Sequence, residues 1–202
     1  MKQLALGISP PPQPTLENFV PGANAELLAR VRALAAGALA EGVLYVWGEP
    51  GSGRSHLLAA AKRAAPGLRV ADDVQRLDPA AQVDLFHAIN GARDSGSGVL
   101  AAGDAPPARL ALREDLRSRL AWGLVYRLHA LTDDDRAVFL GAEARRRGLR
   151  VGDDVIRYLL ARARRDLPSL LGILDALDRA SLERQRPVTL PLVREVLQIA
   201  DE

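Results

Sequence analysis

A glycine-rich segment carries the residues whose types and spacing are best suited to chemistry. It follows the apolar residues 43–47 and precedes a helix-like run at 56–65. In such a segment glycines let backbone N–H groups close around a polyphosphate, the following helix adds its positive end, and a serine hydroxyl coordinates Mg²⁺. The pattern therefore predicts a nucleotide-binding loop, with contacts from Gly48, Gly51, Ser52, Gly53, Arg54, Ser55 and His56.

Arg54 stands where loops of this kind usually carry lysine. Arginine keeps the positive charge, but it is a planar fork rather than a compact ammonium group. We therefore expect phosphate binding rather than fast hydrolysis. A Gly/Pro-rich surface turn that fits the pattern by chance is the alternative, and the strand before the loop and the helix after it argue against that alternative.

Acidic residues follow two other apolar runs. Asp72 and Asp73 come after residues 68–71, and Asp104 comes after residues 98–102. Carboxylates at strand ends beside a phosphate loop hold Mg²⁺ or orient water. We predict this role for Asp72 and Asp73 and place Asp104 near the terminal phosphate, although an Asp-Asp pair in an ordinary turn is the alternative.

Hydrophobic periodicity predicts the elements that must position these residues. We expect strands at 43–47, 68–71, 98–102 and 124–128, and helices at 24–39, 54–65, 79–93 and 110–120. After residue 131 the periodicity is helical throughout. Strands that alternate with helices, followed by helices alone, indicate an α/β nucleotide-binding domain with a C-terminal α-helical lid.

Four helices fit the C-terminal stretch. Thr132 is suited to cap the first, Gly152 precedes the second, Pro168 suits the first turn of the third, and Thr189 precedes the fourth.

Composition excludes several classes of protein. The 202 residues are 48% hydrophobic and 26% charged, and every apolar run is too short to span a bilayer. The first residues lack the apolar segment of a signal peptide, so we expect a cytoplasmic protein without membrane contact. The chain has no cysteine and three histidines without metal-ligand spacing. A net charge of +2 gives no argument for direct DNA binding.

The N-terminal residues alternate in polarity before a proline-rich stretch. Gln3, Leu4, Leu6 and Ile8 precede four prolines between residues 10 and 14, which forbid a helix or a central strand there. We expect a mobile tail on a stiff spacer. An amphipathic tail that packs on its own domain is the alternative.

Segments along nearly the whole chain resemble the AAA+ family and, within it, the replication initiator DnaA and the Hda group of its small regulatory relatives. The segments that carry the resemblance are Glu17–Gly22 with Asn24, Gly48–Ser55, Asp72–Gln75, Phe86-His87 with Asn90, Gly103-Asp104 with Pro106-Pro107, Ser118–Leu120 with Trp122-Gly123, and Leu174–Ser181. The chain stops after the lid, where DnaA continues into a DNA-binding domain, and this favours a regulator over an initiator.

This resemblance implies a set of site residues. Val20 and Asn24 border the adenine, Arg54 and Ser55 bind phosphates, and Asp72 completes the Mg²⁺ shell. ADP is the expected nucleotide, with ATP as the alternative. The domains would be a tail and spacer at 1–15, an AAA+ core at 16–130 and a lid at 131–202.

The resemblance also implies partners. Arg119 matches an arginine finger, which acts in trans on a neighbour's nucleotide. The tail residues Gln3, Leu4, Leu6 and Ile8 resemble a motif that binds the DNA polymerase III sliding clamp. The implied partners are the clamp and DnaA, with DNA met only through the clamp, and a homo-oligomer is compatible with the pattern.

The chain departs from the family at two places. Only 16 residues separate Ser55 from Asp72, too few for the helix and strand that relatives insert there. Because the second strand of the family's sheet is an edge strand, we predict a parallel sheet of four strands rather than five. Pro168 stands where the lid usually carries a sensor arginine, which argues against sensing of the γ-phosphate by the lid.

We expect, from the resemblance, a negative regulator of replication initiation that binds the clamp and stimulates hydrolysis of DnaA-bound ATP through Arg119. An autonomous P-loop ATPase of the helicase-loader or remodelling type is one alternative. A clamp-binding scaffold that has lost nucleotide is another.

Overall fold

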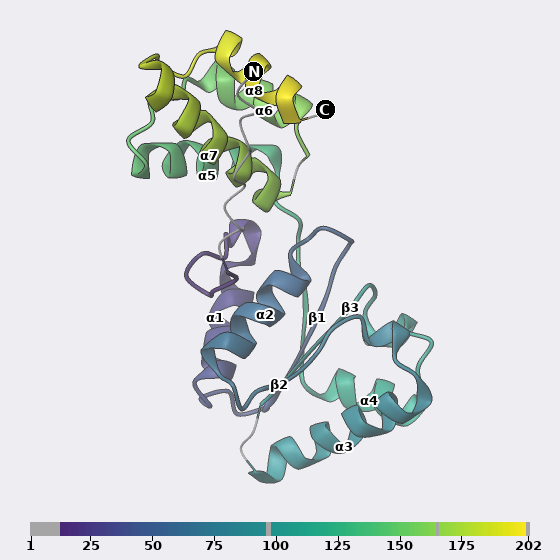
Figure 1. The fold of residues 1–202 in the computed structure, drawn as a ribbon. Coiled ribbons are helices and arrows are strands. Elements are labelled where there is room, and N and C mark those ends of the chain that lie inside the picture. Colours follow the sequence, from purple (N-terminus) through teal and green to yellow (C-terminus); the bar gives the residue numbers. More distant parts are fainter. Residues whose placement is uncertain (1–12, 96–97, 165, 201–202) are drawn as a thin grey trace. The chain divides into compact units, whose positions relative to one another are not determined.

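A computed structural model describes residues 13–95, 98–164 and 166–200 (Figure 1). The chain divides into two compact units, a core unit at Pro14–Leu131 and a helical unit that begins at Thr132. Each unit is described by itself. The expected clamp-binding residues Gln3, Leu4, Leu6 and Ile8 lie outside the described residues.

The core unit is built on a parallel sheet of four strands in the order β2-β3-β1-β4. The strands are β1 (Val43–Trp47), β2 (Arg69–Ala71), β3 (Val99–Gly103) and β4 (Leu124–Arg127). The prediction of four strands, made from the shortened segment before Asp72, is confirmed. The inner strands β1 and β3 are continuous apolar runs because helices cover both of their faces.

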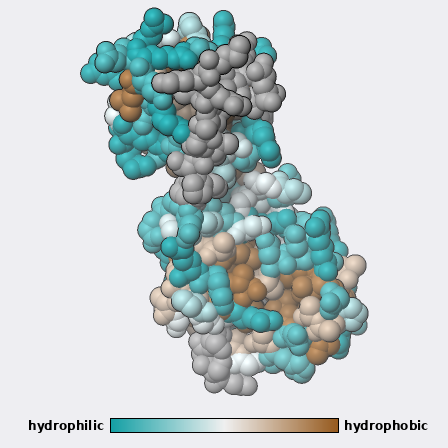
Figure 2. All heavy atoms as spheres, viewed as in Figure 1, coloured by the Kyte–Doolittle hydropathy of each residue, from teal (hydrophilic) through white to brown (hydrophobic). Residues whose placement is uncertain are grey.

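The helical elements of the core unit are η1 (Gly22–Asn24), α1 (Ala25–Ala35), α2 (Arg54–Ala64), η2 (Val74–Arg76), α3 (Pro79–Ser95), η3 (Pro107–Arg109) and α4 (Glu114–Trp122). Alternate residues of β1 pack on opposite layers. Leu44 and Val46 lie in the apolar cluster with α1 and α2, whereas Val43 and Tyr45 lie in the cluster with α3 and α4. In Figure 2 the apolar surface visible on the core unit gathers over its middle, where strands run in Figure 1.

Two helices of the core unit differ from the sequence prediction by four residues at one end. Helix α1 ends at Ala35 rather than residue 39, because Gly37 and Ala38 donate hydrogen bonds back to Leu34 and Ala33 and close the helix. Helix α4 begins at Glu114 rather than residue 110. The chain before it forms the short turn η3 and is then extended at Leu110, so the apolar spacing there does not belong to a helix.

Within the described part of the helical unit there are four helices, α5 (Asp133–Arg146), α6 (Asp153–Arg162), α7 (Leu167–Arg184) and α8 (Leu190–Ala200). Thr132 caps α5 as predicted, and its hydroxyl and the Asp135 carboxylate form a reciprocal capping box. Pro168 lies in the first turn of α7, and Asp166 accepts a hydrogen bond from the Ser169 N–H as the cap.

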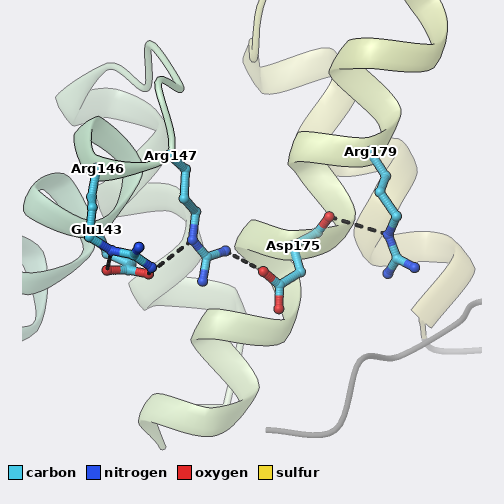
Figure 3. Close-up of polar contacts among 5 residues, drawn as sticks. All are labelled: Glu143, Arg146, Arg147, Asp175 and Arg179. Carbon is cyan, nitrogen blue, oxygen red and sulfur yellow. Dashed lines mark hydrogen bonds and ion pairs between the residues drawn. The ribbon is translucent and has the colours of Figure 1, made fainter. Parts of the chain in front are cut away.

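A polar network joins α5 to α7 in this unit (Figure 3). Glu143 accepts hydrogen bonds from Arg146 and Arg147, and Arg147 also donates to Asp175. The Nε of Arg179 donates to the backbone oxygen of Asp175 at 3.4 Å. The hydrogen bonds from Arg146 and Arg147 lower the pKa of Glu143, so this carboxylate is charged and paired at neutral pH.

Candidate functional site

The glycine-rich loop lies at the carboxyl end of β1 and leads directly into α2. Gly53, the residue before α2, has a φ of +100°, a conformation that a side chain would strain. A Cβ on Gly48 would lie 2.6 Å from the backbone oxygen of Leu128 and 2.9 Å from the Ser52 Oγ. The glycines are therefore required where the loop turns and where it passes close to its neighbours. The N-terminus of α2 has no side-chain cap and no acidic residue in its first turn, so its positive end faces the loop.

Buried polar atoms without partners gather at this loop. Among the described residues the atoms of this kind are Ser52 Oγ, Arg54 Nη1 and Gln75 Oε1. The Arg54 side chain is only 12% exposed. A buried donor without a partner costs roughly 1–3 kcal/mol. A guanidinium N–H and a hydroxyl turned inward at a helix N-terminus suit the oxygens of a phosphate group, so the residues present fit the predicted nucleotide.

Ser55 and Asp72 are brought together as a pair of oxygen donors. The Ser55 hydroxyl donates a hydrogen bond of 2.6 Å to Oδ2 of Asp72, although 17 positions separate the two residues in the chain. Mg²⁺ in phosphate sites is held by one or two protein oxygens together with the phosphates. The pair therefore has the chemistry expected of the protein's share of such an ion. No group of three or more histidine, aspartate or glutamate residues suited to hold a metal occurs in the described ranges.

Asp73 makes contacts that the sequence did not predict. Its Oδ1 lies 3.4 Å from Nη2 of Arg54 and accepts a hydrogen bond of 3.1 Å from the Gln75 amide. Its Oδ2 lies 3.9 Å from a guanidinium nitrogen of Arg76. Nη2 of Arg54 therefore faces a carboxylate, whereas its Nη1 has no partner and is the nitrogen left for a phosphate. The spacing of Arg54 and Asp73 along the chain carried no signal for this contact.

Tyr45 supports the strand end that carries Asp104. The Tyr45 hydroxyl donates to the backbone oxygen of Ala105 at 2.7 Å, one residue beyond Asp104. Burial raises the pKa of Tyr45, and the charge of Asp104 raises it further. The phenol therefore stays protonated as a donor, and it holds the turn after β3. Asp104 itself is exposed, and its proposed place near the terminal phosphate stays a prediction.

The residues expected near the adenine have structural partners. The Asn24 amide donates to the backbone oxygens of Pro21 and His129 and accepts from the His129 N–H, so its polar atoms are all engaged. Asn24 thereby ties the segment before α1 to the chain after β4. Val20 is half-buried beside this segment in the sequence, and its contact with a base stays a prediction.

His56, the third residue of α2, faces the same N-terminal segment. Its Nε2 lies 3.0 Å from Oδ1 of Asn18, and its ring centroid lies 5.8 Å from that of Phe19. Burial lowers the pKa of His56, which favours the neutral ring at pH 7. These contacts fix the segment next to the loop rather than the phosphates themselves.

Arg119 lies in the last turn of α4, and its guanidinium carbon is 3.7 Å from the centroid of the Trp122 ring. It borders a surface hollow of about 560 Å³ that Ala40, Glu41, Val43, Ile89, Asn90, Trp122 and Gly123 also line. Val43 begins β1, whereas the glycine-rich loop follows the end of the same strand. A strand of this length spans about 13 Å. Arg119 is therefore at the opposite end of the sheet from its own loop.

No helix of the described residues is both long enough and apolar enough for a membrane span.

Comparison with known proteins gives the same fold. Residues 133–197 match the family model of the Hda lid domain. Domain III of the replication initiation protein DnaA from Thermotoga maritima is 23% identical over 93% of this chain and 96% of that chain, with a TM-score of 0.69. A replication initiator DnaA bound to AMPPCP and single-stranded DNA is 24% identical over 88% of this chain and 69% of that chain, with a TM-score of 0.68.

The fold extends to a more distant motor protein. The RuvB Holliday junction branch migration motor from Thermotoga maritima is 17% identical over 92% of this chain and 72% of that chain, with a TM-score of 0.63. The chain thus has the fold of domain III of DnaA, and residues 133–197 of its helical unit match the Hda lid domain.

Proposed function

We propose that this chain, an Hda-like and DnaA-related protein, is a negative regulator of chromosome replication initiation. In this proposal it stimulates the hydrolysis of ATP bound to DnaA, and Arg119 is the finger that acts in trans. The Hda-type lid at 133–197 and the DnaA-like fold support a regulator from this branch.

The observation that carries the proposal is the position of Arg119. Its guanidinium borders an open hollow at the end of the sheet where β1 begins, far from the chain's own glycine-rich loop. An arginine in this place is out of reach of its own nucleotide. It is accessible to the nucleotide of a neighbouring AAA+ subunit, whose transition-state charge it would stabilise.

The chain's own loop would hold ADP or ATP as a structural or regulatory ligand. Arg54, with a buried Nη1 that lacks a partner, would contact the phosphates, and Ser55 and Asp72 would share a Mg²⁺ ion with them. The AMPPCP found with a DnaA of the same fold supports nucleotide binding here. The phosphates of the nucleotide would supply negative charge opposite the positive N-terminus of α2 and acceptors for the unpartnered donors of the loop.

The N-terminal residues Gln3, Leu4, Leu6 and Ile8 would bind the DNA polymerase III sliding clamp. A glutamine that hydrogen-bonds at the rim of a pocket and alternate aliphatic side chains that fill an apolar groove suit this mode of peptide recognition. The clamp would bring the protein to DNA, and DNA itself would not be a direct ligand.

The test is the rate of ATP loss from DnaA on clamp-loaded DNA, with and without this protein. Arg119→Ala should abolish the stimulation, because arginine fingers contribute about 10³- to 10⁵-fold in known cases. Arg119→Lys should fail as well, since an ammonium group cannot span two phosphate oxygens as the guanidinium fork does. Arg117→Ala, on the same helix, is the matched control and should stimulate like the wild type. Stimulation that survives Arg119→Ala at an unchanged melting temperature would refute the trans-acting finger.

A further inference from the structure

The ring of Trp122 holds the guanidinium of Arg119 at the surface of α4. The Arg119 Cζ lies 3.7 Å from the centroid of the Trp122 ring and 5.8 Å from the centroid of the Phe86 ring. Trp122 is 60% exposed, which is unusual for so large an apolar side chain. An exposed tryptophan that covers a cation at the tip of a helix calls for an explanation other than core packing.

The backbone beneath this pair is fixed. Trp122 is the last residue of α4, and a Cβ on the following Gly123 would lie only 2.4 Å from the backbone oxygen of Val43. The chain therefore turns tightly against the start of β1 directly after the ring. Leu120, on the same turn, is fully buried. The ring thus stands on a rigid base rather than on a loop.

Stacking and hydrogen bonding use different parts of the guanidinium group. The ring contacts the flat face of the cation, whereas the five N–H donors of arginine lie around its edge in the plane. A stacked arginine can therefore keep its donors available for an oxyanion. At the same time it loses much of the side-chain freedom that a long, exposed arginine otherwise has.

We propose that Trp122 is a positioning residue that preorganises Arg119 to stabilise the transition-state charge on a neighbour's nucleotide. This inference rests on the proposed function of Arg119. Trp122 touches the finger and not the reacting atoms, so it acts through Arg119. Its loss lowers the maximal rate of stimulated hydrolysis by about two- to fivefold, the factor that an exposed cation–π contact contributes.

The first measurement tests the stack without DnaA. The chain has two tryptophans, so Trp47→Phe leaves Trp122 as the single tryptophan, whose fluorescence is excited selectively at wavelengths that tyrosine does not absorb. In this background Arg119→Ala should make Trp122 more accessible to acrylamide quenching, because the guanidinium no longer covers one face of the ring. Arg117→Ala should leave quenching unchanged. Equal quenching with and without the Arg119 side chain overturns the proposal.

The second measurement tests positioning in the reaction. Trp122→Leu keeps apolar bulk without an aromatic face, and Trp122→Phe restores a face. We expect Trp122→Leu to lower the maximal rate of DnaA-ATP hydrolysis with little change in the concentration that gives half-maximal stimulation, and Trp122→Phe to recover most of the rate. A change only in the half-maximal concentration would make Trp122 a docking contact and overturn the positioning role.

The two layers of the proposal fail in different ways. If Trp122→Leu stimulates as well as the wild type while Arg119→Ala does not, the finger stands and the positioning residue is wrong. If Arg119→Ala still stimulates, the trans-acting finger of the proposed function is wrong, and the positioning role is overturned with it.

Discussion

Asp73 lies next to Arg54, the residue proposed to bind phosphate, and removing its charge should tighten nucleotide binding. The change is Asp73→Asn. Asparagine keeps the side-chain oxygen that accepts from the Gln75 amide, and it tolerates the left-handed backbone of this position, where φ is +45°. The substitution therefore removes the negative charge next to Arg54 with little disturbance of the turn.

The separation of the charges gives the size of the effect. At 3.4 Å the attraction between Arg54 and Asp73 is about 5 kcal/mol at an effective dielectric constant of ~20 and about 1 kcal/mol in water. The Asp73 side chain is 40% exposed, so solvent screens it and the lower figure applies. About 1 kcal/mol corresponds to roughly a fivefold change in an equilibrium constant.

We therefore expect Asp73→Asn to bind both ADP and ATP about fivefold more tightly than the wild type, as measured by calorimetry in the presence of Mg²⁺. Asp84→Asn removes the same charge from an exposed position of α3 and is the matched control. In an Arg54→Ala background the gain from Asp73→Asn should disappear, because the group under competition is gone. Weaker binding by Asp73→Asn would refute the reasoning and make Asp73 a ligand of the metal or its water.

Two further predictions concern parts of the chain away from the loop. Replacing Gln3, Leu4 and Leu6 with Ala should abolish binding to the sliding clamp in surface plasmon resonance and leave the melting temperature unchanged. Undiminished binding would contradict the motif. A lower melting temperature would mean that the tail packs on its own domain. Glu143 has a pKa held below its ordinary value by paired arginines, so its stabilisation is present above about pH 4.3 and is lost as the pH falls through the folded-state pKa. Glu143→Gln should therefore lower the melting temperature at pH 7, as measured by circular dichroism, and this loss should shrink as the pH falls below about 4.3. A loss that does not shrink with falling pH would contradict the ion-pair account.

The sheet was predictable because its inner strands, β1 and β3, are buried on both faces. Val43–Trp47 forms β1 with the bounds that its apolar run predicts, and the short segment before Asp72 leaves no room for an extra strand. The cap at Thr132 was equally predictable from the sequence, since the capping box is a local interaction. The start of α4 was not predictable, because the apolar residues before Glu114 pack as an extended segment. Periodicity alone does not distinguish such a segment from a helix.

The candidate site was likewise predictable only in the features that depend on local backbone structure. The loop was identifiable because its glycines are needed for backbone reasons that any phosphate loop shares, as the positive φ of Gly53 illustrates. The pairing of Arg54 with Asp73 was not identifiable. It depends on how far a guanidinium extends from the start of α2 to the turn after β2, and the spacing of the two residues in the sequence does not encode that distance.

The contacts of Asp73 indicate whether it can act as a general base at the glycine-rich loop. A carboxylate that activates water needs a free lone pair directed at the nucleophile. One oxygen of Asp73 is engaged by Arg54 and by the Gln75 amide, and the other faces Arg76. A carboxylate in this setting is a counter-ion for the loop arginine and is poorly suited to be a general base. This setting of Asp73 agrees with the proposal that the loop holds a nucleotide without turning it over and that Arg119, which borders a hollow at the other end of the sheet, acts on a partner's nucleotide.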